Sequence, residues 1–429
     1  MNTHDGGNGA ARAAYRLHRG LREEGISSRM FVRTKETDDG SVDAFEMSLG
    51  LSLWERVRRW LRRERIQRAF SPYEETRPEQ AELFYDDRTP YKGHILNQSP
   101  SADIYQLHTI YGFVDHRSFF HEVSRPVVWT LHDVNPFTGG CQYNVDCTRY
   151  RQSCGRCPQL GSETERDLSR HVWHRKRCAS RPLIEEGRLQ VVAPSTWMAR
   201  EARRSSLFSE ATIEVIPNGL DPEAFRPRDT EGVATALGIP PDHRIVLFLA
   251  SSTEHPRKGF DLFSEAVEAI GESEVSFISV GGGEPELAEH LHHVHLGHVE
   301  SDLLLSVFYS LADLFVIPSR QDNLPNTVLE SMACGTPVVG TDTGGIPDMV
   351  RPGETGWLAE TGNVRELRAT IETALREKGK RTQMASRCRR VVEKKYTLER
   401  QAREYKALYH SLMHEDSGRV DGAGVRSKV

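Results

Sequence analysis

Short apolar runs alternate with amphipathic stretches along most of the chain. The runs are continuous, not alternately apolar and polar, which is typical of strands buried on both faces of a parallel sheet. Stretches with helical spacing separate them, and this repeated order predicts a doubly wound α/β fold. The predicted strands are 30–32, 104–108, 127–131, 189–193, 245–250, 275–280, 314–318 and 338–340, and the predicted helices include 12–24, 258–270, 303–312 and 328–334.

The strand–helix pattern occurs twice, on either side of a segment rich in proline, glycine and aspartate at 216–227. Such a composition is typical of a connection, so we expect two Rossmann-like domains. The pattern after residue 362 is helical, and the last residues carry glycine, serine and charge without apolar periodicity. The predicted parts are one domain at 1–218, a second at 219–395, a helix at 396–414 and a disordered tail at 415–429.

Glycines near the start of the chain resemble a strand-to-helix turn, but no apolar strand precedes them. Gly6, Gly7 and Gly9 precede a predicted helix, as a glycine-rich strand-to-helix turn does. No apolar run lies among the five residues before them. We therefore predict that the first strand of this domain is missing, and we favour a native start upstream of Met1. The alternative is a flexible terminus.

Composition narrows the class of protein. The 429 residues include 56 Lys and Arg against 61 Asp and Glu, and the formal net charge of −5 argues against nucleic acid as a partner. No apolar run approaches the ~18–20 residues that span a bilayer, and no signal-peptide core follows the first residues. We expect a cytoplasmic protein.

Candidate chemistry concentrates between residues 314 and 350. A predicted strand ends at Pro318, a loop with Asp322 follows, and Glu330 lies on the next predicted helix. Ligands of open α/β sheets bind beyond the carboxyl ends of the strands, and the free N–H groups of a helix N-terminus favour a diphosphate there. Carboxylates accept hydrogen bonds from sugar hydroxyls. The segment therefore predicts a site for a nucleotide-linked sugar.

Several motifs in order carry a family resemblance: Met332-Ala-Cys-Gly-Thr-Pro-Val-Val339, Thr343-Gly-Gly-Ile-Pro-Asp348, Val215-Ile-Pro-Asn-Gly-Leu-Asp221 and Arg257-Lys-Gly259. The chain resembles the retaining enzymes of glycosyltransferase family 4. The resemblance implies the GT-B fold, two facing Rossmann-like domains with an interdomain cleft. It also implies that the first domain holds the acceptor, that the second holds a nucleoside-diphosphate sugar, and that the helix at 396–414 crosses back to the first domain.

The resemblance assigns roles to residues of the second domain. Lys258 resembles the lysine that neutralises the donor diphosphate, and Arg257 is a candidate for the second cation, because Ala250-Ser-Ser252 stands where the family has an arginine. Asp322 replaces the family's first glutamate, and Pro325 removes a backbone donor from the loop that follows. The expected donor-binding residues are Arg257, Lys258, Gly281, Gly282, Asn323, Leu324, Asn326, Thr327 and Glu330.

In the first half, Trp129-Thr-Leu-His-Asp133 and Pro136-Phe-Thr-Gly-Gly-Cys141 resemble a polysaccharide-assembly branch of the colanic-acid type. The resemblance implies a role in bacterial exopolysaccharide, O-antigen or capsule synthesis, a lipid-linked saccharide acceptor, and catalysis with neither a protein nucleophile nor a metal cofactor. The expected catalytic residues are His132, Lys258, Asp322 and Glu330, and the expected acceptor-side residues are Gly6, Gly7, His108, His132 and Asp133. A structural role is the alternative for both histidines.

Two other functions stay open. One is a phosphorylase-like or sugar-phosphate-dependent synthase on the same fold. The other is a non-catalytic GT-B binding protein, which the missing strand, Asp322 and Pro325 would suit.

Four cysteines are crowded into a short stretch, with the spacing C-x5-C-x6-C-x2-C. In a cytoplasmic chain such a group is more typical of a structural zinc site than of disulfides, and free thiols are the alternative. The candidate ligands are Cys141, Cys147, Cys154 and Cys157.

A basic, aromatic helix is predicted at 51–70, where seven arginines stand against two glutamates. Leu53, Trp54, Val57, Trp60 and Leu61 fall near helical spacing. Basic and aromatic residues on one helix are typical of a segment that lies on a membrane surface, and an ordinary solvated arginine face is the alternative. We therefore expect peripheral contact with the inner face of the plasma membrane.

Overall fold

A computed structural model describes residues 1–47, 52–270 and 274–422 of the chain. The chain divides into two compact units: unit 1 is Met1–Pro217 together with the residues from Gln401 onward, and unit 2 is Asn218–Arg400. The sequence predicted the divisions after residues 218 and 395. No helix in the described ranges is both long and apolar enough to cross a membrane.

Unit 1 contains parallel strands in two hydrogen-bonded sets, β1-β2-β3 and β4-β5-β6-β7. Backbone hydrogen bonds from His108 N to Met1 O (3.0 Å) and from Thr3 N to Thr109 O (2.8 Å) join the segments of β1 and β4. The order is therefore β3-β2-β1-β4-β5-β6-β7. The strands are β1 (Asn2–His4), β2 (Met30–Thr34), β3 (Val42–Ala44), β4 (Tyr105–Leu107), β5 (Val127–Thr130), β6 (Leu189–Ala193) and β7 (Thr212–Val215).

Strand β1 corrects the prediction that the first strand is missing. Its residues are polar, so a search for apolar runs does not find it, yet Asn2 and Thr3 are buried in the centre of the sheet. Asn2 Oδ1 accepts a hydrogen bond from Thr109 N (2.9 Å), and Thr3 Oγ1 donates one to Thr109 O (2.7 Å). Because their polar groups are satisfied by β4, these side chains are tolerated where apolar ones are usual.

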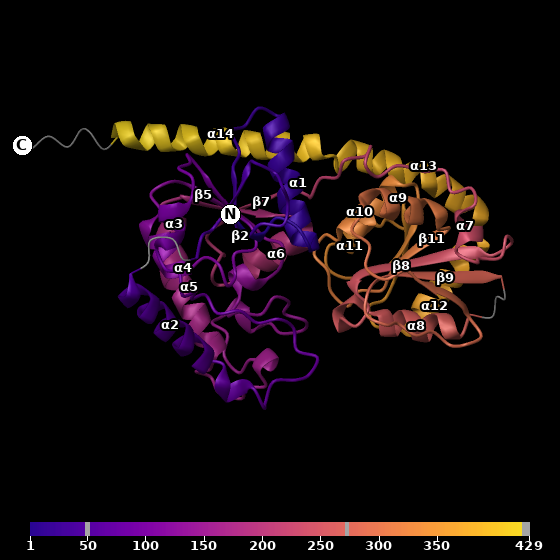
Figure 1. Cartoon of the computed structure of the whole chain (residues 1–429), viewed down its shortest axis with the longest axis horizontal. Helices are drawn as coiled ribbons and strands as arrows, with labels where there is room; N and C mark the ends of the chain where they lie inside the picture. Colours follow the sequence, from indigo (N-terminus) through magenta and orange to yellow (C-terminus); the bar gives the residue numbers. More distant parts are fainter. Residues whose placement is uncertain (48–51, 271–273, 423–429) are drawn as a thin grey trace, which may run out of the picture. The chain divides into compact units, whose positions relative to one another are not determined.

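Helices surround the strands of unit 1 (Figure 1). Trp129, Phe119 and Phe208 are among the large side chains buried in its core. The helices are α1 (Gly9–Glu23), α2 (Leu53–Arg68), α3 (His94–Gln98), α4 (His116–Glu122), α5 (Leu168–Glu185) and α6 (Thr196–Arg204), with 3₁₀ turns at Ser71–Tyr73, Asn135–Phe137, Arg149–Arg151 and Pro158–Leu160.

The described part of unit 2 has one parallel sheet with the order β10-β9-β8-β11-β12-β13. Neighbouring residues of β8 alternate between two cores, with Leu247 in one and Val246 and Phe248 in the other, so apolar layers cover both faces of the sheet. This arrangement confirms the doubly wound α/β class. The strands are β8 (Arg244–Ser252), β9 (Val275–Gly282), β10 (His292–His295), β11 (Leu314–Ile317), β12 (Val338–Thr341) and β13 (Gly356–Ala359).

The helices of unit 2 precede, connect or follow these strands along the chain (Figure 1). They are α7 (Val233–Ala236), α8 (Phe260–Glu268), α9 (Asp302–Leu311), α10 (Asn326–Ala333), α11 (Ile346–Met349), α12 (Val364–Arg376) and α13 (Lys378–Lys395), with a 3₁₀ turn at Pro256–Lys258. In both units the strand order reverses between the first and the fourth strand, β1 and β4 in unit 1 and β8 and β11 in unit 2. Ligands of such sheets bind at the carboxyl ends of the strands at this point.

Helix α14 (Leu398–Gly422) begins at the end of unit 2 and continues on unit 1. Tyr405 OH hydrogen-bonds Thr130 Oγ1 (2.7 Å), and Tyr409 OH donates to Gln106 Oε1 (2.6 Å). The helix includes 415–422 of the segment that the sequence predicts as a disordered tail. Residues 423–429 of that predicted tail lie outside the described ranges.

Candidate active site

In unit 2, two cations meet one buried carboxylate at the point where the strand order reverses. Arg257 and Lys258 lie in the 3₁₀ turn after β8, and Asp322 lies in the loop after β11. Lys258 Nζ is 2.6 Å from Asp322 Oδ2, and Arg257 Nη1 is 3.5 Å from Asp322 Oδ1. The structure thus brings together three of the predicted site residues from loops 64 positions apart.

The trio carries a surplus of positive charge. Burial alone would raise the pKa of Asp322, but Lys258 and Arg257, with hydrogen bonds from Lys258 and Ser319, hold that pKa below its usual value. Asp322 is therefore ionised at neutral pH and offsets one of the two cations. The three groups together carry a formal net charge of +1, and in a partly desolvated site that charge acts on an anionic ligand more strongly than it would in water.

Glycines bring the surrounding loops into backbone contact. Gly344, in the loop after β12, has φ +57°, and a Cβ atom there would overlap the carbonyl oxygen of Asp322. Gly345 N donates to that same oxygen (3.0 Å). Gly259, after the 3₁₀ turn, has φ +72°, and a Cβ there would overlap the carbonyl oxygen of Pro318. The two glycines hold the loops after β8, β11 and β12 at one edge of the sheet.

Helix α10 supplies the remaining predicted donor-side residues. Pro325 stands at its N-cap position without a side-chain cap, so the first backbone N–H groups, beginning at Asn326 and Thr327, form an electropositive end. Glu330 is buried one turn further on, and Tyr309 OH of α9 donates to its Oε2 (3.3 Å). Asn323 and Leu324 are buried in the preceding loop.

The predicted glycines, Gly281 and Gly282, are the last residues of β9 and contact the end of β8 and the loop after it. Thr253 N and Oγ1 donate to Gly282 O (2.9 and 3.1 Å), and Gly281 N donates to Gly297 O (2.8 Å). Gly281 has φ +147°, and a Cβ there would overlap the carbonyl oxygen of Ala250. These glycines allow the ends of β8 and β9 to approach closely.

Sequence reasoning missed three side chains of this site. Ser319 Oγ donates to Asp322 Oδ2 (3.3 Å), His255 precedes the 3₁₀ turn, and Tyr309 holds Glu330. Burial and the neighbouring cations lower the pKa of His255, so it is neutral at pH 7. Ser319 could have been found because it directly follows a predicted strand. Tyr309 could not, since its role depends on how α9 packs against α10.

In unit 1, a histidine pair lies beyond the carboxyl ends of β4 and β5. His108 Nδ1 is 2.9 Å from His132 Nε2, so one ring donates and the other accepts. Burial lowers the pKa of His132 to about 4 and that of His108 well below its usual value. Both rings are therefore neutral at pH 7, and each keeps a second nitrogen of defined donor or acceptor character.

The predicted acceptor-side residue Asp133 sits inside a hydrogen-bond network. Tyr111 OH and Gln142 Nε2 donate to its Oδ2, the latter at 3.1 Å, and Asn135 N donates to Oδ1 (2.9 Å). Buried Lys176 of α5 donates to the carbonyl and side-chain oxygens of Asn135 (2.6 and 3.0 Å). This network fixes the loop that follows His132, and the contributions of Tyr111 and Lys176 could not be read from the sequence.

The turn with Gly6 and Gly7 lies between β1 and α1, at the same edge of the sheet. A Cβ on Gly6 would lie 2.8 Å from Glu36 Oε2, and Gly7 has φ +75°. Asn8 caps α1 by accepting from Ala11 N (3.0 Å). Because a carboxylate faces the turn, the surroundings suit hydroxyl groups better than phosphate.

The four clustered cysteines, Cys141, Cys147, Cys154 and Cys157, form no disulfide bond. Gly139 N donates to Cys154 Sγ (3.2 Å), and burial raises the pKa of Cys141, Cys154 and Cys157 to about 12. Within the described ranges, no three His, Cys, Asp or Glu side chains are grouped as metal ligands. The zinc site stays a prediction.

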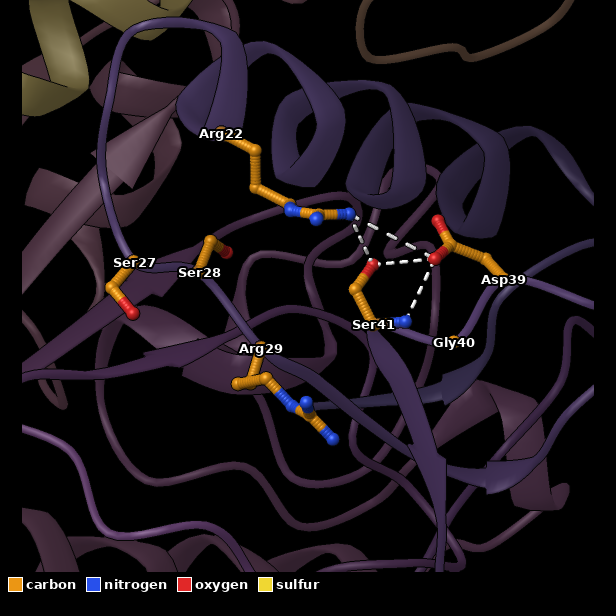
Figure 2. Close-up of a pocket in the computed structure, with 7 residues that line it drawn as sticks. All are labelled: Arg22, Ser27, Ser28, Arg29, Asp39, Gly40 and Ser41. Carbon is orange, nitrogen blue, oxygen red and sulfur yellow. Dashed lines mark hydrogen bonds and ion pairs between the residues drawn. The ribbon is translucent and has the colours of Figure 1, made fainter.

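A polar cavity of ≈ 490 Å³ lies at the other edge of unit 1 (Figure 2). Its polar groups pair with one another: Arg22 Nη1 donates to Ser41 Oγ (2.7 Å), and Ser41 Oγ donates to Asp39 Oδ1 (2.6 Å). Its lining residues directly precede β2 and β3, so it lies at the amino ends of these strands, away from the ligand edge. They are Arg22, Ser27, Ser28, Arg29, Asp39, Gly40 and Ser41.

Replacing Gly344 by alanine should destabilise unit 2 far more than replacing Gly353. Both glycines have positive φ, but a Cβ at Gly353 meets no atom within 4 Å. Gly353→Ala should cost about 1–2 kcal/mol of unfolding free energy from backbone strain. Gly344→Ala should cost at least about 2 kcal/mol more, because the Asp322 loop must move. Urea denaturation measures both, and equal costs would contradict the loop contact.

His132 should make the protein sensitive to acid. Its pKa of about 4 in the folded state lies below the unfolded value near 6.5. The unfolded chain therefore binds the extra proton between these values, and the free energy of unfolding falls as the pH drops through that window. At pH 7, His132→Gln should lower the free energy of unfolding by about 1 kcal/mol, because the hydrogen bond to His108 is broken. Between pH 6.5 and 4, the free energy of unfolding of this variant should fall less than that of the wild type. Exposed His298→Gln is the control, and a wild-type slope in His132→Gln would refute the assignment.

Curated relatives match part of the chain. The N-acetyl-alpha-D-glucosaminyl L-malate synthase of Bacillus anthracis is 25% identical over 211 residues, which cover 48% of this chain and 55% of that protein. The D-inositol 3-phosphate glycosyltransferase of Mycobacterium marinum is 33% identical over 179 residues, which cover 39% of this chain and 38% of that protein. The chain thus spans about half of the first relative's length and less of the second's.

Solved structures match almost the whole chain. Sucrose-phosphate synthase from Thermosynechococcus elongatus aligns with a TM-score of 0.64 at 17% identity, over 96% of both chains. HepE from Anabaena, in complex with UDP and glucose, aligns with a TM-score of 0.60 at 16% identity, over 96% of this chain and 98% of that one. At this identity the likeness concerns the fold, and it confirms the predicted GT-B architecture of two α/β domains.

Family models match both units. One described as Glycosyl transferases group 1 matches residues 243–377, which include the Lys258–Asp322 pair and Glu330. One described as Glycosyltransferase Family 4 matches residues 7–224, which are more than half of the chain. The chain therefore belongs to glycosyltransferase family 4.

Proposed function

We propose that this protein transfers a sugar from a nucleoside-diphosphate sugar to a hydroxyl group of an acceptor, with the donor bound in unit 2. The observation that carries the proposal is the trio of half-buried Arg257 and Lys258 with buried Asp322 at the β8–β11 reversal point. A diphosphate needs fixed positive charge and N–H donors; the trio supplies the charge, and the start of α10, which no side chain caps, supplies backbone N–H groups. Family membership supports the same reaction class.

The proposed chemistry follows the charge. As the bond between the sugar's anomeric carbon and the diphosphate oxygen breaks, negative charge grows on the leaving diphosphate, and Lys258 and Arg257 stabilise it. The acceptor oxygen forms the new bond to the anomeric carbon, and its proton passes to the leaving phosphate oxygen. In the retaining reaction that we propose, attack occurs on the face that the diphosphate leaves. The two cations and the helix end supply the stabilisation, so the proposed reaction uses no divalent metal.

The carboxylates have separate proposed roles. Asp322 is ionised and accepts hydrogen bonds from hydroxyls of the donor sugar, while its pairing with Lys258 keeps the ammonium group in place. Glu330, held by Tyr309, accepts from the ribose diol of the nucleotide. Pro325 offers no backbone N–H to the donor sugar. We therefore infer that contacts between Asn323 and the sugar's hydroxyl groups contribute more to sugar recognition here than they would if residue 325 had an N–H.

Unit 1 is the proposed acceptor side. The neutral His108–His132 pair offers a fixed donor or acceptor to a sugar hydroxyl, and Asp133 positions the loop beside it. We propose a lipid-linked saccharide as the acceptor, in bacterial exopolysaccharide, O-antigen or capsule assembly, with the protein at the cytoplasmic face of the plasma membrane. One solved structure of the same fold is WaaG, a glycosyltransferase involved in lipopolysaccharide biosynthesis, which supports this choice.

One nucleotide class should stabilise the protein against heat. A donor at 100 times its Kd adds about 2.7 kcal/mol to the free energy of unfolding. Thermal unfolding with UDP-, GDP- and ADP-hexoses should therefore show a clear shift with one base. Lys258→Ala should weaken that donor about 10- to 100-fold, since a charge-assisted contact contributes ~1.5–3 kcal/mol.

Two further variants complete this experiment. Glu330→Gln should weaken the same donor, while Lys380→Ala, at an exposed lysine of α13, should bind it as the wild type does. Absence of any shift in the wild-type protein, or equal shifts in Lys258→Ala and Lys380→Ala, would count against the donor site. Release of the sugar by inorganic phosphate alone would favour a phosphorylase-like enzyme.

A further inference from the structure

Helix α2 contacts the rest of unit 1 through side chains on its polar side. Arg62 donates from Nε to Thr89 O (2.7 Å) and from Nη2 to Asp115 Oδ2 (2.6 Å), and Asp115 is itself the N-cap residue of α4. One turn earlier, the guanidinium group of Arg59 lies 5.2 Å from the ring centroid of Tyr91. Arginines therefore anchor the helix, and none of its residues is buried.

The opposite side of α2 exposes apolar side chains to solvent, and by helical spacing Glu64 and Arg68 fall on that side near its C-terminal end. At 100° per residue, Leu53, Trp54, Val57, Trp60 and Leu61 fall on the side away from Arg59 and Arg62. Leu53 is 76% exposed, Trp54 75% and Trp60 58%. An ordinary surface helix turns its apolar stripe to the core, so this helix is reversed. We call these five residues the outward face.

Arginines border the outward face on both sides. By the same helical spacing, Arg56 and Arg63 lie along one edge, and Arg58 and Arg65 lie along the other. Seven arginines and two glutamates give the helix a net charge of +5, in a chain whose formal net charge is −5. The positive charge is thus local to the surface that also exposes the two tryptophans.

We propose that the outward face of α2 docks the protein on an anionic lipid bilayer, with the helix parallel to the membrane plane. Leucine and valine would enter the acyl boundary, and tryptophan rings favour the interfacial layer. The bordering arginines would pair with lipid phosphates.

The charge of α2 favours an anionic bilayer over a second copy of the chain as the partner of the outward face. A two-fold contact through the outward face would bring two helices of net charge +5 against each other. An anionic surface attracts the same arginines instead. The proposal rests on the exposure and charge of α2 and does not depend on the transfer reaction.

The test measures sedimentation of the full-length protein with vesicles. We expect binding to vesicles of phosphatidylcholine mixed with phosphatidylglycerol, little binding to phosphatidylcholine alone, and a blue shift of tryptophan emission on binding. Arg58→Gln with Arg65→Gln should weaken binding about 30-fold, at about one kcal/mol for each charge near the surface. Trp54→Gln with Trp60→Gln should weaken it at least about 10-fold.

Controls separate docking from folding and from donor binding. The paired change Arg368→Gln and Arg376→Gln on α12 also removes two exposed arginines and should leave vesicle binding unchanged. Every variant should keep the wild-type unfolding temperature and the wild-type response to the nucleotide sugar.

Three results would overturn the proposal. The first is equal binding to vesicles with and without phosphatidylglycerol. The second is vesicle binding that the α2 changes do not alter. The third is a light-scattering mass showing a dimer that the tryptophan changes dissociate, which would assign the face to a second copy.

Discussion

The ion pair between half-buried Lys258 and buried Asp322 is the interaction on which the proposed site depends. A carboxylate buried without a partner is costly, and here Lys258 at 2.6 Å and Arg257 at 3.5 Å compensate for its charge. The pair joins the loop after β8 to the loop after β11, and Gly345 ties in the loop after β12 through the carbonyl of Asp322. The ion pair thus links two of the strand-end loops, alongside their backbone hydrogen bonds, and reduces the positive charge that an incoming anion meets.

The two units share a strand order that reverses at the same point, but one has charged and the other has neutral side chains there. In each, the strand order reverses beside the first strand, so chemistry-bearing loops gather at β1–β4 and at β8–β11. Unit 2 places two cations there. Unit 1 places a neutral histidine pair there, because burial keeps His108 and His132 unprotonated at neutral pH. This difference suits the transfer that we propose, from an anionic donor in unit 2 to a neutral hydroxyl in unit 1.

Much of this arrangement could be predicted from the sequence, and the exceptions have physical causes. All eight predicted strands overlap strands of the structure, since buried parallel strands are continuous apolar runs. Strand β1 escaped because Asn2 and Thr3 are polar and become acceptable only through their bonds to Thr109. Motif order indicated Lys258 and Asp322, whereas Tyr309, Tyr111 and Lys176 act through packing that no local pattern encodes. The composition of α2 could be read from the sequence, but which of its sides faces solvent could not.

Calorimetric titration of free UDP, GDP and ADP into the wild type and two variants tests the central claim most directly. If the trio of Arg257, Lys258 and Asp322 is the diphosphate site, Lys258→Ala should bind the preferred nucleotide about 10- to 100-fold more weakly. Asp322→Asn should bind it at least as tightly as the wild type, because it removes a negative charge from the site. Loss of binding in Asp322→Asn, or unchanged binding in Lys258→Ala, would contradict the account.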